Sequence, residues 1–234
     1  MQKELNYRIH GRTSSHLSKK NKDLLENNLK SYLFDIPILS SLNFSKVILE
    51  IGFGSGEHIY HLAKENPNFL YIGSEVYLNG IAALLDKLSN NHLSNLLIYP
   101  KDVRLLLDDL ILNKIDFLSE VYIYYPDPWP KSKHNKRRII NNTTIPQIFN
   151  LMSSNSNLYI ATDSQDYKNH ILQLFNSLNL FEWIIQDISE IHTPPPNHYP
   201  TKYELKALKN NLKPYYFTFS KNIIKSIAKE LKIT

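Results

Sequence analysis

The stretch that most constrains the fold runs from Lys46 to Gly56 and reads KVILEIGFGSG. Its first six residues are rich in branched aliphatic side chains, which is typical of a buried β-strand. Three glycines at alternate positions follow and predict a tight turn with positive φ angles. A helical pattern over Glu57–Asn66 comes next and is stopped near Pro67. This order predicts the first unit of an α/β fold in which a ligand approaches the glycine turn.

The same alternation continues along the chain. Further strands are predicted at Phe69–Glu75, Asn95–Tyr99, Val121–Tyr125 and Asn157–Thr162, and helices at residues 23–42 (interrupted at Pro37), Leu78–Leu88, Val103–Leu112, Ile145–Met152 and Gln165–Leu178. Strands that alternate with helices indicate a doubly wound, mostly parallel sheet. Two late strands, Trp183–Ile188 and Tyr215–Phe219, are expected to form an antiparallel pair. The Pro-rich stretch HTPPPNHYPTKYE between them is expected to be an irregular loop.

Length and composition set the broad class. A chain of 234 residues predicts a single domain, expected over 23–234, preceded by a mobile basic arm at residues 1–22. The formal net charge of +5 favours a polyanionic partner. No stretch approaches the roughly 20 apolar residues of a membrane span, and the polar N-terminal segment does not resemble a signal peptide. The sequence has no Cys, which excludes thiolate chemistry and fits a reducing, cytoplasmic location.

Three acidic residues, Glu50, Glu75 and Asp102, lie at the ends of successive predicted strands. A carboxylate at the end of the second strand can accept hydrogen bonds from both ribose hydroxyls of a ligand, and Asp102 lies where an adenine ring would follow. A dinucleotide is disfavoured because Glu57 occupies the third glycine position of G-x-G-x-x-G. The structural alternative is that these acids cap helices, or that Glu50 pairs with a lysine.

The segment that follows the fourth strand, IYYPDPWPKSKHNKRR, covers residues 123–138. Pro126 and Pro128 restrict φ on both sides of Asp127 and so stiffen the position of its carboxylate. Trp129 offers a flat face on which a base can stack. Phosphate contacts are expected from Lys131, Lys133, Lys136, Arg137 and Arg138. His134 either contacts RNA or shapes the turn, and the plain alternative is a turn followed by a solvated helix start.

Taken in order, the motifs LEIGFGSGEH, GSE, LSNL, PDPWPKSKHNKRR, ATD and PTKYE resemble those of bacterial tRNA (guanine-N7)-methyltransferases over roughly residues 45–220. The resemblance implies a Rossmann-like class I fold, S-adenosylmethionine as donor, and methylation of guanosine 46 in the tRNA variable loop. It implies cofactor binding by Glu50, Gly52, Gly54, Gly56, Glu75, Asp102 and Asp127, with Asp127 as the catalytic residue. It implies substrate binding by Lys131, Asp163, Thr201, Lys202, Tyr203 and Glu204. The chain departs from the family pattern at Lys101, Val103 and Pro130.

Guanine N7 carries an in-plane lone pair and no proton, so its methylation requires alignment of N7, methyl carbon and sulfur. The methylated ring gains positive charge, which a fixed carboxylate stabilises. We expect Asp127 to supply that carboxylate, either as a base or only as an electrostatic stabiliser. Asp163 is expected to read the same guanine edge and Lys131 to hold a phosphate or ribose. Thr201 and Glu204 are expected to close over the base.

Two other functions compete with this hypothesis. One is a methyltransferase with a different acceptor, against which the basic run and Trp129 argue. The other is a catalytically idle RNA-binding module, which donor binding would distinguish. No metal is expected, because His58 and His61 lack an acidic third ligand. The expected partner is tRNA without an obligate protein partner, and both monomer and homodimer remain open.

Overall fold

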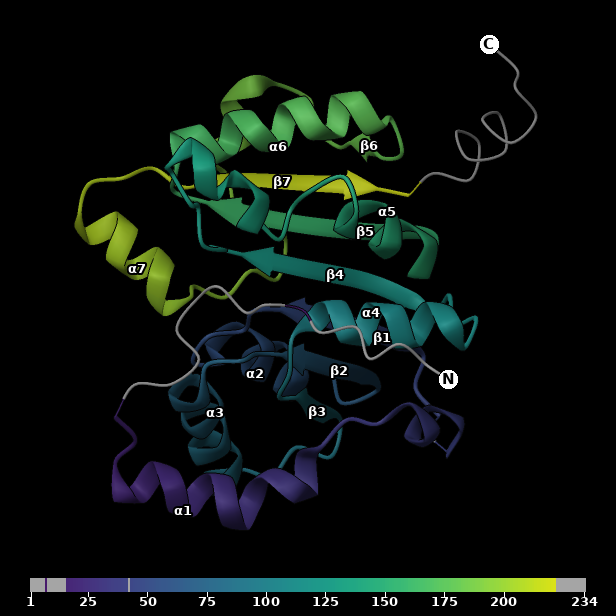
Figure 1. The fold of residues 1–234 in the computed structure, drawn as a ribbon, viewed down its shortest axis with the longest axis vertical. Helices are drawn as coiled ribbons and strands as arrows, with labels where there is room; N and C mark the ends of the chain where they lie inside the picture. The colour runs from purple at the N-terminus through teal and green to yellow at the C-terminus, as the bar shows by residue number, and fades with distance from the viewer. Residues whose placement is uncertain (1–6, 8–15, 42, 222–234) are drawn as a thin grey trace.

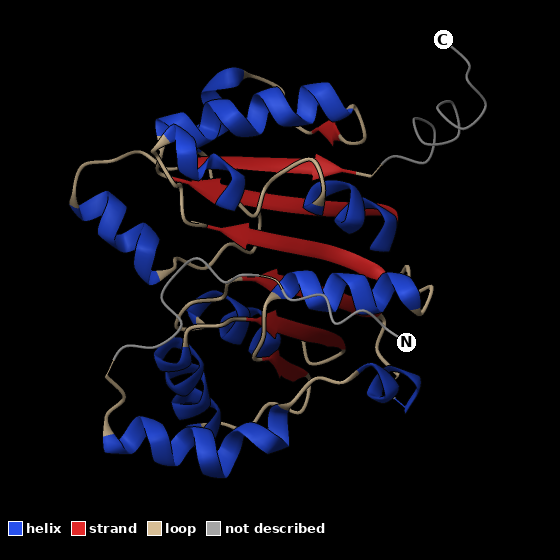
Figure 2. Cartoon of the chain, viewed as in Figure 1, coloured by secondary structure: helices blue, strands red, loops and turns tan. Residues whose placement is uncertain are grey.

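A computed structural model describes residue 7 and residues 16–41 and 43–221, so most of the arm predicted at residues 1–22 lies outside the described residues. The described part contains a seven-stranded sheet of order β3-β2-β1-β4-β5-β7-β6 (Figures 1 and 2). The strands are β1 (Lys46–Ile51), β2 (Phe69–Ser74), β3 (Leu96–Tyr99), β4 (Leu118–Tyr124), β5 (Met152–Thr162), β6 (Glu182–Trp183) and β7 (Tyr215–Ser220). The first five run parallel, and β7 is antiparallel to β5 and β6. The predicted mostly parallel sheet with antiparallel late strands is therefore confirmed.

Helices cover both faces of the sheet and create two apolar cores. One core contains Ile59 and Leu85 from helices on one face, and the other contains Leu107 and Ile148 from helices on the opposite face. The first face carries α1 (Lys19–Asn28), α2 (Glu57–Glu65) and α3 (Leu78–Asn90), and the second carries α4 (Val103–Leu112), α5 (Thr144–Leu151) and α6 (Gln165–Leu178). Burying apolar residues on both faces of the parallel strands explains their continuous aliphatic runs.

Three predicted elements differ from the structure. The helix predicted at residues 23–42 begins at Lys19, where Ser18 caps it, and gives way to the 3₁₀ segments η1 (Leu29–Tyr32) and η2 (Ile36–Ser41). The strand predicted at Trp183–Ile188 is only the two-residue β6, and Ile188 opens the 3₁₀ segment η4 (Ile188–His192). The Pro-rich stretch predicted as an irregular loop, residues 192–204, ends in a helix that was not predicted, α7 (Lys202–Lys209). This helix is short and buries only Glu204 and Ala207, while Leu205 and Leu208 are exposed.

The strand order reverses between β1 and β4, which pair directly. The helix that follows β1 packs on one face of the sheet, and the helix that follows β4 packs on the other. Ligands of open α/β sheets bind where such a reversal separates the loops at the carboxyl ends of the strands. Figure 1 shows α7 standing beyond the edge toward which β4 and β5 point. A ligand site is therefore expected at this edge of the sheet.

The side chain of Asn95, just before β3, allows a test of what holds this edge strand in the sheet. Its buried side-chain amide donates to the carbonyls of Ala63, Asn66 and Phe69 at 2.9, 3.1 and 3.0 Å. We expect Asn95→Leu to lower the free energy of unfolding by about 1–3 kcal/mol, because buried acceptors lose their donor. Urea denaturation measures this loss. Asn68→Ala, at an exposed position, is the control and should change stability by less than about 0.5 kcal/mol; equal losses would contradict the assignment.

Candidate active site

The glycine turn adopts the predicted conformation. Gly52, Gly54 and Gly56 have φ angles of 73°, 58° and 74°, which side-chain-bearing residues rarely adopt. A Cβ on Gly56 would lie 2.8 Å from the Leu84 side chain, so close packing also requires glycine there. At Gly52 a Cβ would meet nothing within 4 Å. Gly52 therefore presents bare backbone to open space, as a turn that receives a ligand must.

Two cavities meet at this turn. The first, of about 220 Å³, extends from Gly52 and Glu75 past Asp102 to the residues that follow Trp129. The second, of about 470 Å³, extends from the same turn to α7, where Tyr203 and Lys206 line it. The two cavities share the lining residues Gly52, Glu75, Val76, Pro126 and Asp127. If each cavity held a ligand, the two ligands would therefore meet beside the carboxylates of Glu75 and Asp127.

Glu75, which follows β2, ties the glycine turn to the next strand. Its Oε2 accepts from the Gly54 N–H at 2.8 Å, and its Oε1 accepts from the N–H groups of Val76 and Tyr77 at 2.7 and 2.9 Å. Burial raises the pKa of the Glu75 carboxyl and the nearby Asp127 charge adds to that rise, against the opposing effect of the three N–H groups. The carboxylates of Glu75 and Asp127, which both line both cavities, favour a cationic ligand where the cavities meet.

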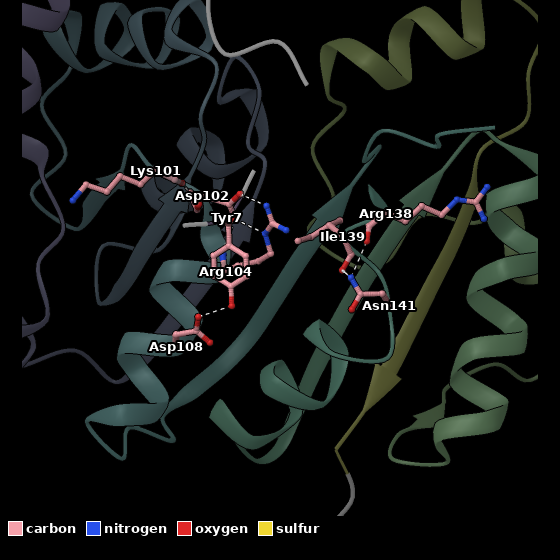
Figure 3. Close-up of polar contacts among 9 residues, drawn as sticks. Tyr7, Lys101, Asp102, Arg104, Asp108, Arg138, Ile139 and Asn141 are labelled. Atoms are coloured by element: carbon pink, nitrogen blue, oxygen red, sulfur yellow. Dashed lines mark hydrogen bonds and ion pairs between the residues drawn. The ribbon is translucent and has the colours of Figure 1, made fainter. Parts of the chain in front are cut away.

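Asp102 both caps a helix and lines the first cavity. Its Oδ1 accepts from the backbone N–H and the Nε of Arg104, each at 2.9 Å, and its Oδ2 accepts from the Arg104 guanidinium at 2.6 Å. The Arg104 guanidinium lies 4.4 Å from the ring centre of Tyr7, whose hydroxyl donates to Asp108 (Figure 3). The hydrogen bond to Asp108 raises the pKa of Tyr7 to about 12. The Asp102 carboxylate is therefore already paired with Arg104 where it faces the cavity.

Glu50 occupies a different environment from the other strand-end acids. It is 2% exposed and does not line either cavity; its Oε2 lies 3.0 Å from Nδ1 of the buried His58. Side chains alternate along a strand, so Glu50 shares the face of Ile48 and points toward α2. His61 stacks on Tyr199 with ring centres 4.1 Å apart. Neither histidine belongs to a three-residue cluster of metal-binding side chains among the residues that the structure describes.

The PDPW segment places Asp127 at the junction of the cavities, exposed to solvent. Tyr125 and Trp129 on either side of it have positive φ angles of 50° and 43°. The Arg137 guanidinium lies 4.9 Å from the centre of the Trp129 ring, and His134 meets that ring edge-on at 5.8 Å. These contacts hold the Trp129 ring in the wall at one end of the first cavity. The ring therefore helps to form this wall, in addition to the base stacking that was expected of it.

The five cations of the basic run fall into three environments. Lys131, Lys133 and Lys136 are exposed, in and beside the 3₁₀ segment η3 (Ser132–Arg137), and Arg137 is half-buried against Trp129. Arg138 differs from the expected phosphate contact: it is 2% exposed, and in Figure 3 its side chain extends away from the Asp102–Arg104 pair. The three lysines are thus open to solvent, whereas the Arg138 side chain is enclosed by protein.

The residues of the PTKYE motif also fall into a buried and an exposed group. Thr201 caps α7 by accepting from the Glu204 N–H at 3.1 Å, and the buried Glu204 carboxylate accepts from Tyr216 at 2.8 Å and lies 2.6 Å from His198 Nε2. Burial is the largest single effect and raises the pKa of Glu204, but the hydrogen bonds from His198 and Tyr216 and the other nearby contacts together lower that pKa below its ordinary value. Lys202 and Tyr203 are exposed. Thr201 and Glu204 therefore hold α7 in place in this structure, and only Tyr203 of the four lines a cavity.

Several lining residues were not predicted. Lys101 and Arg104 flank Asp102 in the first cavity, and Lys206 lines the second one turn after Tyr203. Their closeness in sequence to predicted residues was a usable signal, and the same signal existed for Asn141, which lines the first cavity shortly after Arg138. Asp163 follows β5 at the same edge and is half-buried, and it does not line either cavity.

The fold and the site define the class of protein. A sheet of this order with a glycine turn after β1, acids after β2 and β3, and bare backbone at Gly52 fits S-adenosylmethionine, whose sulfonium and ammonium groups suit the carboxylates at the junction. The family model described as "Putative methyltransferase" matches residues 45–217. A crystal structure of the 16S rRNA methyltransferase KamB has the same fold, with a TM-score of 0.58 and 12% identity over 81% of this chain and 94% of that chain. The chain has a class I methyltransferase fold.

Sequence relatives give the family. A tRNA (guanine-N(7)-)-methyltransferase of Bartonella quintana is 38% identical over 79% of this chain and 80% of its own length. A bifunctional methyltransferase of Rickettsia prowazekii is 40% identical over 86% of this chain, and the match spans only 38% of that longer relative. This chain belongs to the tRNA (guanine-N7)-methyltransferase family.

Gly80 in α3 tests the packing of the glycine turn. A Cβ at this position would lie 2.3 Å from the backbone oxygen of Gly54. We expect Gly80→Ala to displace the turn, lowering stability by about 1–3 kcal/mol despite the better helix propensity of Ala, and to weaken S-adenosylmethionine binding. Urea denaturation and titration calorimetry measure the two effects. Asn90→Ala, at the exposed end of the same helix, is the control; wild-type cofactor affinity in Gly80→Ala would contradict the assignment.

Proposed function

We propose that the protein transfers a methyl group from S-adenosylmethionine to N7 of a guanine in tRNA, and that this guanosine is residue 46 of the variable loop. The observation that carries the proposal is the shared wall of the two cavities, where Glu75 and Asp127 face both. A donor in one cavity and a base in the other would meet at these carboxylates. The family membership and the names of its relatives support the same reaction.

The first cavity is the proposed donor site. When bound there, S-adenosylmethionine supplies an electrophilic methyl group on a sulfonium ion. Gly52 offers backbone to the ligand, and Glu75 has used three of roughly four acceptor positions, which leaves one for a ribose hydroxyl. Asp102 offers its carboxylate to the adenine end. Glu50 would act indirectly, because its carboxylate is turned toward His58 beneath the turn.

The second cavity is the proposed acceptor site. Guanine N7 needs no deprotonation before attack, so the residues here have to align the base and stabilise the charge that develops on it. Asp127 is fixed between two prolines and two residues of positive φ, which limits its movement. Its carboxylate would stabilise the methylated, cationic ring. Tyr203 and Lys206 line the outer wall, where they would contact the base or its phosphate.

The exposed lysines that follow Asp127 are the proposed RNA surface, and one of them, Lys136, lines the first cavity. Lys131, Lys133 and Lys136 project from the segment that follows Asp127, together with His134. Phosphate contacts by such side chains position a nucleic acid without reading its sequence. We propose a cytoplasmic enzyme, formed by one domain over residues 23–234, that acts on tRNA without an obligate protein partner. In the part of the chain that the structure describes, no helix is long and apolar enough to span a membrane.

Asp127→Asn tests the catalytic assignment. We expect a loss in kcat of about 10²-fold with tRNA affinity within about twofold of wild type, because the variant keeps the shape of the side chain and removes its charge. The assay is methyl transfer from labelled S-adenosylmethionine to unmodified tRNA, followed by nucleoside analysis for 7-methylguanosine and cleavage mapping of its position.

The matched control is Asp116→Asn, an exposed carboxylate just before β4, at the opposite edge of the sheet. It should leave transfer unchanged. Near-normal turnover by Asp127→Asn would remove Asp127 from the mechanism. A different methylated nucleoside with the wild-type protein would overturn the guanine assignment, and no transfer despite donor and tRNA binding would favour the idle RNA-binding module.

Lys133→Gln tests the RNA surface. We expect the slope of log affinity for tRNA against log salt concentration to become shallower by about 0.7–0.9, as for the loss of one phosphate contact. Filter binding over a range of KCl concentrations measures the slope. Lys114→Gln, an exposed lysine in the loop before β4, is the control and should leave the slope unchanged. An unchanged slope for Lys133→Gln would place the RNA elsewhere.

A further inference from the structure

Arg138 ends the basic run but lies inside the protein. Its Nε donates to the Pro128 carbonyl at 2.8 Å, and its terminal nitrogen donates to the Trp129 carbonyl at 3.5 Å and pairs with the Asp166 carboxylate. The guanidinium lies 5.0 Å from the ring centre of Tyr167. Arg138 therefore joins the loop after β4 to the first turn of α6, which follows β5.

The loop that it holds is strained. Tyr125 and Trp129 are bulky residues with positive φ angles, a conformation that is unfavourable for them and persists only where surrounding contacts enforce it. At the start of the loop, the Tyr125 N–H donates to the Ala161 carbonyl at 2.8 Å. At its end, the carbonyls of Pro128 and Trp129 are both bound by Arg138. Asp127 lies between these two anchors.

The residues that follow Arg138 are fastened to the same helix. The Ile140 N–H donates to the Tyr167 hydroxyl at 3.4 Å, and the Ile140 carbonyl lies 2.8 Å from Nε2 of His170. The Asn141 amide donates to the Arg138 carbonyl at 2.8 Å. The anchor at Arg138 is thus itself held by α6, so that a rigid helix, not a solvated loop, sets the position of the PDPW segment.

We propose that Arg138 is a positioning residue that fixes the PDPW loop, and with it the Asp127 carboxylate, and that it makes no contact with tRNA phosphates. The proposal rests on the proposed methyl transfer and deepens it. A guanidinium has several N–H donors in one plane, which match two carbonyls and a carboxylate at once. A lysine would keep the charge but lose this geometry. Loss of Arg138 should therefore slow the chemical step without weakening the electrostatic attraction of tRNA.

The test compares Arg138→Lys, Arg138→Gln and Asp166→Asn with Lys133→Gln. We expect both Arg138 variants to lose at least about tenfold in kcat at saturating tRNA, because small displacements of a reacting group have effects of this order. Their salt slopes for tRNA binding should match wild type. Asp166→Asn, whose carboxylate is 63% exposed, should lose about two- to fivefold in kcat. Lys133→Gln should instead make the salt slope shallower.

The opposite pattern would overturn the proposal. If Arg138→Gln made the salt slope shallower by about 0.7–0.9 while Arg138→Lys restored kcat, Arg138 would be a phosphate contact after all. If the Arg138 variants fail to fold, Asp166→Asn still tests the proposal, because a surface substitution at the first turn of α6 should leave the fold intact. An unchanged kcat in Asp166→Asn would refute the anchoring role of Arg138.

A second readout separates this proposal from the proposed function. In a Trp183→Phe background Trp129 is the only tryptophan, because the chain has two. We expect Arg138→Lys to increase the acrylamide quenching of Trp129 fluorescence, since its loop is released from α6. Unchanged quenching would refute the positioning role whatever reaction the enzyme performs. Increased quenching without guanine methylation by the wild-type protein would sustain the anchor and refute the proposed function alone.

Discussion

The site depends on one constraint, the reversal of strand order between β1 and β4. Because the helices that follow these neighbouring strands pack on opposite faces, the two loops at their carboxyl ends diverge and leave room between them. Gly52 comes from one loop and Asp127 from the other, and both residues line both cavities. The proposed donor and acceptor sites are therefore adjacent as a direct consequence of the sheet topology.

The acids at the three strand ends show how environment separates similar residues. Glu75 and Asp102 line the first cavity, the former held by backbone N–H groups and the latter by Arg104. Glu50 is buried against His58 on the α2 side. The alternation of side chains in KVILEI was a usable signal, because it places Glu50 on the same face as Ile48. It could not show which face the cavity would occupy, since that depends on the packing of neighbouring loops.

Environment also separates the five cations of the basic run. In sequence its five cations look equivalent, and each was expected to contact phosphate. In the structure the lysines are exposed, Arg137 lies against Trp129, and Arg138 is buried with Asp166 and Tyr167. Burying a charge is unfavourable unless it is paired and hydrogen-bonded, and Arg138 has both kinds of partner. The enclosed cation thus stabilises a strained loop, whereas the exposed cations remain available to a polyanion.

Local sequence patterns were enough to predict the alternation of strands and helices, the antiparallel late strands, the positive φ angles of the glycine turn and the acids at the strand ends. These features follow from local propensity and periodicity, which neighbouring residues set. Tertiary contacts alone placed Glu50 and Arg138 inside the protein and formed α7 with its Glu204 buried. Each of these depends on contacts between segments far apart in the chain, such as Arg138 with α6, and local sequence patterns do not encode which segments will meet.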